Sequence, residues 1–368
     1  MNDRLAERAL WLAAAALCVA GCAGAAQAGR GPGRLMTATP LPQIPASHDN
    51  AATPEPTASA RPAAPLARTP QVKVAEVRVL FTGDINPGRC PAQIALAADD
   101  YTLPYRAVAA ELQAADLVVG SLDGVLSDLS PPIACVPEGE YNLIGPTRTV
   151  EGLAYAGFDL VTLATNHALD CGHLGFVCDG LTLSDTLAAF RAVDIATVGA
   201  GLNRAEARQA VVLSRNGLRL AFLGASAVGE FAWAGADTPG IAPLSTEHLH
   251  HLLADIRAAR ASADIVVVLL HWGVEYESSP SIDQRRWAER MLDAGATVIV
   301  GTHPHVTQPI EPLGAGLVAY SLGNFVFDQD PQATRAGNVL EATFTASGLS
   351  AWRVLPIEIV DLHRPEWR

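Results

Sequence analysis

From about residue 73, apolar and polar residues follow a pattern that switches repeatedly between the strand period and the helix period. Short apolar runs such as VAEVRVLFTGD (74–84) and DIVVVLLHWG (264–273) predict buried strands. Apolar residues three or four positions apart, as in RTVEGLAYAG (148–157) and TEHLHHLLADIRAARAS (246–262), predict amphipathic helices. Strands that alternate with helices indicate a mixed α/β sheet protein, built as one domain.

The turns between these elements also carry signals. Asn216-Gly217 separates two alternating segments, and this dipeptide strongly favours a two-residue hairpin. We expect a second hairpin within 308–325 and antiparallel strands around Gly348 at the end of the chain. The other predicted elements are helices at 105–115, 183–193 and 283–295, and strands at 116–123, 158–167, 194–201 and 296–305.

The first 22 residues lie outside this pattern. Arg4 and Arg8 precede an apolar run, ALWLAAAALCVAG (9–21), that is short for a membrane span and typical of a signal-peptide core. The run closes on VAGC, which resembles a lipobox and would make Cys22 the lipidated first residue of the mature protein. Ordinary signal-peptidase cleavage after the AQA that follows, or an uncleaved anchor, are the alternatives. We therefore expect an exported protein, attached to the membrane of the cell envelope by a lipid.

A proline-rich segment, residues 23–72, separates this signal from the globular part. Such a segment cannot bury enough apolar surface to offset the loss of entropy on ordering, so we expect a disordered tether. The sequence thus predicts a lipoprotein-type signal peptide at 1–22, a tether at 23–72 and a globular domain at 73–362.

Composition and charge narrow the possible partners. Of the 368 residues, 49% are hydrophobic and 17% are charged, which allows a sizeable core. The formal net charge of −13 at pH 7 argues against nucleic acid as a partner. It also argues against electrostatic attraction of the protein to an anionic membrane surface. A polyanionic substrate would also be repelled unless a metal ion or a local basic cluster reverses the field.

Four cysteines lie beyond the predicted signal peptide. An even number of cysteines outside the cytosol favours disulfides. Cys171 and Cys178 are close enough in sequence to staple a loop, which would leave Cys90 to pair with Cys135. Free buried thiols are the alternative. Zinc binding by these four is not expected, because no CxxC spacing occurs.

Residue types that bind metals follow five of the predicted strands. In open α/β sheets, ligands bind outside the carboxyl ends of the strands, where loops from separate elements converge. Alone, each residue could be a cap, a turn former or a packed polar side chain. As a set, carboxylates, imidazoles and an amide suit one or two divalent ions such as Mn, Zn or Fe. The residues at these strand ends are Asp84, Asp123, Asn166, His167, His271, His303 and His305.

These stretches together resemble the CapA family of capsule synthesis proteins, which is associated with bacterial poly-γ-glutamate. The resemblance spans residues 79–328 and implies a four-layer α/β/β/α sandwich of the calcineurin-like metallophosphoesterase type, with antiparallel strands at the C-terminus. The motifs that carry it are FTGDINPGR, GSLDGVLSD, AGFDLVTLATNHALDCG, HWGVEY, DAGATVIVGTHPHVTQPIE and YSLGNFVFD.

The resemblance implies that the seven residues at the strand ends form the metal site, with Asp84, His167 and His305 in catalytic roles. Water activated by the metal would attack a phosphoryl or amide centre, and His167 or His305 would protonate the leaving group. Two departures matter. The family usually has Asn-x-Glu where this chain has Ser121 and Asp123, and metallophosphoesterases have Asp-x-His where this chain has Asn86.

Three further residues lie where they could assist such a site. Glu275 and Asn324 could support ligand imidazoles by hydrogen bonding, and Arg89 could contact an anionic substrate. Structural roles are the alternatives: a salt bridge for Glu275, a turn for Asn324, and a surface position for Arg89.

Two functions remain open on the sequence. The first is an exported metal-dependent hydrolase that acts on a phosphoester or on a γ-linked glutamyl amide. The second is an accessory protein without turnover, which binds the anionic polymer and helps a polyglutamate synthase or export complex; its metal site would be structural or vestigial.

Overall fold

The computed structural model describes residues 75–131, 134–135, 141–172 and 178–368, within the compact unit Pro70–Arg368. The predicted signal peptide (1–22), its Cys22 and the predicted tether (23–72) lie outside the described residues. Among the residues that are described, no helix combines the length and the apolar character that a membrane crossing requires.

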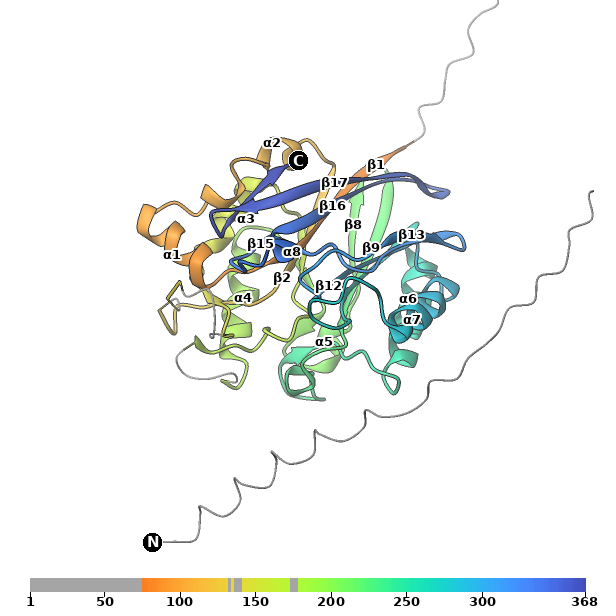
Figure 1. The fold of residues 1–368 in the computed structure, drawn as a ribbon. Helices are drawn as coiled ribbons and strands as arrows, with labels where there is room; N and C mark the ends of the chain where they lie inside the picture. Colours follow the sequence, from red (N-terminus) through yellow and green to blue (C-terminus); the bar gives the residue numbers. More distant parts are fainter. Residues whose placement is uncertain (1–74, 132–133, 136–140, 173–177) are drawn as a thin grey trace, which may run out of the picture. The chain divides into compact units, whose positions relative to one another are not determined.

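The first of two large sheets has eight strands (Figure 1). Strands β1, β2, β5 and β6 are parallel, β15 adds to β1 in the same direction, and β16, β17 and β18 are antiparallel. In spatial order the strands are β18 (Arg364–Trp367), β17 (Gly348–Val360), β16 (Ala336–Thr345), β1 (Val77–Ile85), β2 (Leu117–Leu122), β5 (Leu160–Thr162) and β6 (Ala196–Val198), with β15 (Asn324–Val326) also paired to β1.

The second sheet has six strands, of which β9, β11, β12 and β14 are parallel. Its antiparallel edge strand β8 joins β9 through Asn216 and Gly217, whose φ angles of 48° and 85° confirm the predicted hairpin turn. In spatial order the strands are β13 (Ile310–Leu313), β14 (Gly316–Ala319), β12 (Val298–Thr302), β11 (Ile265–His271), β9 (Leu218–Ser226) and β8 (Val211–Arg215).

Alternate residues of the strands enter different hydrophobic cores, because successive side chains of a strand point to opposite faces. Phe81 and Val119 of the first sheet pack with Phe222, Leu269 and Val300 of the second, so the two sheets lie face to face. The opposite faces are covered by helices. On the first sheet these are α2 (Ala109–Gln113), α3 (Thr149–Ala156) and α4 (Leu181–Ala192), and on the second α6 (Leu249–Ser262) and α7 (Ile282–Asp293) (Figure 1).

This arrangement confirms the predicted four-layer α/β/β/α sandwich. Several bounds differ from the sequence prediction. The first sheet continues through β18, past residue 362, and the predicted strand 158–167 is regular only in β5, with a turn after it. The predicted helix 105–115 is an α-helix only in α2, and the predicted strand 194–201 is divided between β6 and a second short strand. The smaller elements are α1 (Arg89–Ala98), which was not predicted, α5 (Arg204–Ala207), α8 (Gln332–Arg335), η1 (Leu103–Tyr105), η3 (Glu230–Ala232), β3 (Val125–Leu126), β4 (Ile144–Gly145), β7 (Ala200–Gly201) and β10 (Gly240–Ile241).

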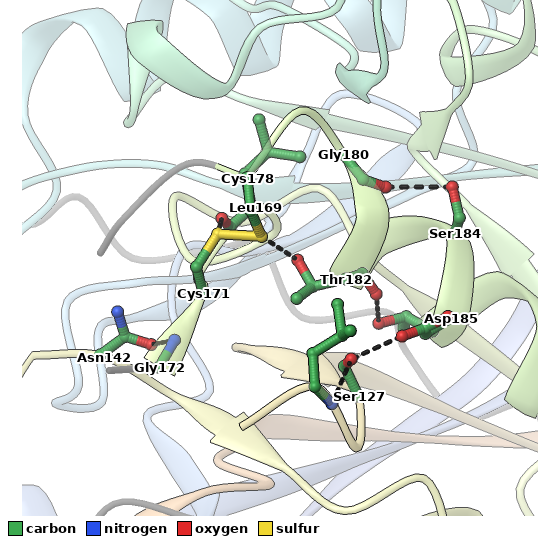
Figure 2. Close-up of a disulfide and its surroundings, with 12 residues drawn as sticks. Ser127, Asn142, Leu169, Cys171, Gly172, Cys178, Gly180, Thr182, Ser184 and Asp185 are labelled. Atoms are coloured by element: carbon green, nitrogen blue, oxygen red, sulfur yellow. Dashed lines mark hydrogen bonds between the residues drawn. A yellow bond between two sulfur atoms is a disulfide. The ribbon is translucent and has the colours of Figure 1, made fainter. Parts of the chain in front are cut away.

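Two disulfides join the four cysteines in the expected pairs, Cys90 with Cys135 and Cys171 with Cys178. The second lies beside the start of α4 (Figure 2). Next to it, the backbone N–H of Gly172 donates to the side-chain oxygen of Asn142 at 2.7 Å. The chain that follows β5 is therefore held both by a covalent link and by hydrogen bonding.

Candidate metal centre

The carboxylate of Asp84 joins the two sheets. It lies at the end of β1 and is fully buried, and it accepts hydrogen bonds from Ser121 Oγ at 2.8 Å and from the backbone N–H of His303 at 3.0 Å. The residue before it must be glycine, because a Cβ at Gly83 would lie 2.0 Å from the carbonyl oxygen of Gly323. This close approach places the end of β1 against the turn before β15.

Asp123 follows β2 and is also fully buried. Within the described part of the chain, neither of its carboxylate oxygens has a hydrogen-bond partner. One of them lies 3.8 Å from His271 Nε2. Asp123, Asp84 and His305 can each offer one ligand atom, and these three atoms lie within 4.8 Å of one another. This is a group of donors with the spacing that a metal ion requires.

A second group of donors adjoins the first. His271, the last residue of β11, places Nε2 2.8 Å from Asn166 Oδ1 and 3.2 Å from His303 Nδ1. Its Nδ1 lies 3.1 Å from Thr302 Oγ1, and 3.8 Å from Asp84 Oδ1. The structure thus brings together donors from β1, β2 and β11 and from the loops after β5 and β12.

His303 and His305 have φ angles of 99° and 57°, a backbone conformation that residues other than glycine rarely adopt. Asn324 of β15 fixes the second ring, since its Oδ1 accepts from His305 Nδ1 at 2.9 Å while its Nδ2 donates to Thr334 O at 3.0 Å. The His305 Nε2 lone pair is then the one available to an ion. This is the supporting role expected for Asn324.

Burial shifts the protonation of these groups toward their neutral forms. Burial, together with the neighbouring Asp123, raises the pKa of Asp84 from 3.8 to about 8. Burial also raises the pKa of Asp123, and it lowers the pKa of His303 to about 4 and that of His305 to about 3. Neutral imidazoles are the form that binds metals, and a cation would allow both carboxylates to ionise.

His167 differs from the other imidazoles. Its Nδ1 lies 2.7 Å from Oδ2 of Asp170, a buried carboxylate that also accepts the backbone N–H of Leu143 at 2.6 Å. Burial opposes its protonation, but the charges of Asp170 and Asp123 outweigh burial and raise the pKa of His167 to about 9. In the metal-free protein His167 is therefore the imidazole of this group that holds a proton most readily. The sequence prediction missed Asp170, although its i+3 spacing from His167 was a usable signal.

Three residues differ from their expected surroundings. Glu275 is exposed and forms no hydrogen bond to a ligand imidazole in the described residues, because the loop after β11 docks through the backbone of Tyr276 instead. Arg89 is not a surface residue: its side chain is buried, and its guanidinium pairs with Asp328. Asn86 donates to Asp328 at 3.1 Å and accepts from the N–H of Gly88 at 2.8 Å, so its amide is engaged outside the donor cluster.

The donor set fits a divalent cation. Two buried carboxylates, one of them without hydrogen bonds, face neutral imidazoles and an amide oxygen, and such mixed sets suit Mn, Zn or Fe. Asp123 lies between the two groups, so the residues could hold one ion or two. One group is Asp84, Asp123 and His305, and the other is Asn166, His271 and His303 with Asp123.

Comparison with known proteins agrees with the motifs. Residues 78–329 match the family described as bacterial capsule synthesis protein PGA_cap. The chain belongs to this family. The matched range includes every residue of the donor cluster and Asp170.

Three relatives align over different shares of the chain. The PGA biosynthesis protein CapA of Bacillus subtilis (strain 168) is 34% identical over 298 residues, which cover 80% of this chain and 75% of that protein. The capsule biosynthesis protein CapA of Bacillus anthracis is 32% identical over 287 residues, covering 77% and 68%. A probable polyglutamine synthesis accessory protein of Mycobacterium tuberculosis (strain ATCC 25618 / H37Rv) is 29% identical over 177 residues, covering 46% and 45%. The family predicted from the motifs is confirmed.

Proposed function

We propose that this protein acts in capsule or poly-γ-glutamate synthesis through a metal-dependent, hydrolase-type site, on a phosphoester or a γ-glutamyl amide. Membership of the PGA_cap family supports the pathway, as do the names of the two CapA relatives, a PGA biosynthesis protein and a capsule biosynthesis protein. The buried cluster of carboxylates and imidazoles supports the chemistry.

The observation that carries the proposal is the carboxylate of Asp123. A buried carboxylate without hydrogen bonds is destabilising by several kcal/mol, or it remains protonated. Asp123 lies beside a second buried carboxylate, Asp84, and repulsion between the two negative charges further disfavours their ionisation. A divalent cation held by Asp84 and Asp123 would offset these charges, and the neighbouring imidazoles could supply further ligands.

Each residue then has a role in the reaction. When bound, a divalent cation supplies Lewis acidity, which polarises a phosphoryl or carbonyl oxygen and makes water a better nucleophile. Asn324 fixes the ring of His305, and Ser121 fixes the carboxylate of Asp84. His167, oriented by Asp170, holds a proton at the edge of the cluster and transfers it to the leaving oxygen or nitrogen.

A second candidate is an accessory protein that binds the anionic polymer through the same cation without cleaving it, within a polyglutamate synthase or export complex. The Mycobacterium relative, named a probable polyglutamine synthesis accessory protein, supports it, as does the change of the family's Asn-x-Glu to Ser121 and Asp123. Here the ion would bind polymer carboxylates, and His167 would have no leaving group to protonate.

Metal content and turnover separate these two functions. The purified protein should contain a divalent metal by mass spectrometry, and it should hydrolyse bis(p-nitrophenyl) phosphate or a γ-glutamyl oligomer. His271→Ala should lose both metal and turnover. His250→Ala, an exposed histidine on α6, is the matched control and should keep both. Metal with polymer binding but no turnover would support the accessory function, and a protein that takes up no metal would refute the site.

We also propose that the protein is exported and held at the membrane by a lipid on Cys22. The apolar run that ends in VAGC supports this. Wild type should incorporate labelled palmitate and fractionate with membranes, whereas Cys22→Ser should do neither. Labelling of the Cys22→Ser variant at the level of wild type would contradict the assignment.

A further inference from the structure

Tyr276 lies beside the metal centre without belonging to its donor set. It follows β11. Its backbone N–H donates to the carbonyl oxygen of Pro304 at 2.8 Å, and Pro304 lies between His303 and His305 in the loop after β12. The ring centroid of Tyr276 lies 6.3 Å from that of His305. The residue is 56% exposed, so a group near the donor cluster remains open to solvent.

The backbone of Tyr276 is strained. Its φ is 65°, in the left-handed region. Apart from Gly, Asp and Asn, the described chain has positive φ at four other residues, namely Arg89, His303, His305 and Leu362. Such conformations disfavour large side chains and persist where the surroundings impose them, which is often at functional sites. Tyr276 shares this property with His303 and His305, the residues on either side of Pro304.

A chain of hydrogen bonds connects its hydroxyl to the centre. Asn324, whose Oδ1 accepts from His305, donates from Nδ2 to Gln329 Oε1 at 3.1 Å. Gln329 in turn donates from Nε2 to Tyr276 Oη at 3.4 Å. Because the phenol oxygen accepts this hydrogen bond, its own proton is left to donate to another acceptor.

From this geometry we propose that Tyr276 is a substrate-positioning residue, which donates its hydroxyl hydrogen bond to an oxyanion of the substrate at the metal centre. The proposal rests on the proposed metal site and specifies how that site recognises its substrate. The oxyanion is a phosphoryl oxygen in a phosphoester and a carboxylate in a γ-glutamyl unit. Either is attracted by the cation, and the phenol proton fixes its orientation.

The test measures binding and does not depend on turnover. The purified full chain is loaded with Co²⁺, whose visible absorption reports metal affinity. Inorganic phosphate and γ-glutamyl-glutamate are then titrated by calorimetry. Tyr276→Phe should keep the cobalt affinity of wild type and bind at least one probe about tenfold more weakly, as expected for the loss of a hydrogen bond to a charged group. The probe that is weakened identifies the source of the oxyanion.

Two further variants provide a control and a milder perturbation. Tyr155→Phe removes a partly exposed phenol from α3, so it should match wild type in every titration. Gln329→Leu leaves the phenol but removes its hydrogen-bond donor, so it should weaken probe binding less than Tyr276→Phe does. A loss of cobalt affinity in Tyr276→Phe equal to its loss of probe affinity would make the residue structural and overturn the proposal.

The remaining outcomes separate this inference from the proposed function. If wild type binds no cobalt, the metal site fails and the role of Tyr276 fails with it. If wild type binds cobalt and a probe, but Tyr276→Phe binds both probes as tightly as wild type, only the role of Tyr276 is refuted. Cobalt binding without affinity for either probe also refutes that role, while the metal site stands.

Discussion

Replacing Asp84 by Asn removes one charge from the centre and keeps the shape of the side chain. Both hydrogen bonds of the carboxylate can survive the change. The amide oxygen accepts from the N–H of His303, and the amide nitrogen donates to Ser121 Oγ. The hydroxyl proton of Ser121 then turns to Thr302 Oγ1, which lies 3.2 Å away. The main effect of Asp84→Asn on the metal-free protein is therefore electrostatic.

The size of this effect follows from the pKa of Asp84, which burial and Asp123 raise from 3.8 to about 8. Because the folded pKa lies above the unfolded one, the metal-free protein is destabilised above pH 3.8, and increasingly so up to about pH 8. Between pH 3.8 and pH 7, at about 1.36 kcal/mol per pH unit, the penalty reaches about 4 kcal/mol. Asn has no such penalty, so the metal-free variant should be more stable than wild type by up to about 4 kcal/mol at pH 7.

Urea unfolding, followed by tryptophan fluorescence in the presence of EDTA, measures this difference. The advantage of Asp84→Asn should be large at pH 7, shrink toward pH 4 and disappear below about pH 3, where the carboxyl is protonated in both the folded and the unfolded protein. Added Mn²⁺ should stabilise wild type and stabilise the variant much less, since binding to the folded state alone raises stability. Asp237→Asn, at an exposed carboxylate, should change little. A variant less stable than wild type at pH 7 in EDTA would refute the reasoning.

Three other changes test the fold. Gly83→Ala places a Cβ 2.0 Å from a backbone oxygen and should destabilise the protein by about 3 kcal/mol or more in thermal melts; an unchanged melting temperature would contradict the close approach. Hydrogen bonds from Arg353 lower the pKa of Glu341 below 4.5, so Glu341→Gln should reduce stability in urea at pH 7 but not near pH 3; equal losses at both pH values would exclude a charge effect. Replacing both Cys171 and Cys178 by Ala opens a short loop and should lower the free energy of unfolding by about 2–3 kcal/mol. Reductant should cause no further loss of stability in this variant if the Cys90–Cys135 disulfide resists reduction.

The strands that carry the centre were predictable because their signals are local. The run that ends at His271 is continuous and apolar, and the run that ends at Asp84 is mostly apolar, as expected for strands buried on both faces. The convergence of donors then follows from the parallel order of the strands, since their carboxyl ends lie at one edge of each sheet. The hairpin at Asn216 was predictable for the same reason, because its turn type depends on two adjacent residues.

The contacts around the centre were not predictable, because they depend on which loop lies against which. Asp170 was passed over: its spacing from His167 was a signal, but only the fold of the loop after β5 shows that its carboxylate turns to that ring. Glu275 was expected to support an imidazole, but the neighbouring Tyr276 makes the backbone contact and Glu275 stays in solvent. Likewise, the burial of Arg89 follows from its ion pair with Asp328, 239 positions away in the sequence.

The order of the strands along the chain has a consequence for synthesis. All six strands of the second sheet fall within residues 211–319, and this segment supplies His271, His303 and His305. The first sheet is made from the segments on either side of it, and β1 pairs with β15 and β16, which are translated near the end. Asp84 therefore cannot reach its final surroundings until about the last fifth of the chain has emerged. If the centre binds an ion as proposed, a newly made molecule should acquire it only after this C-terminal segment has completed the sheet.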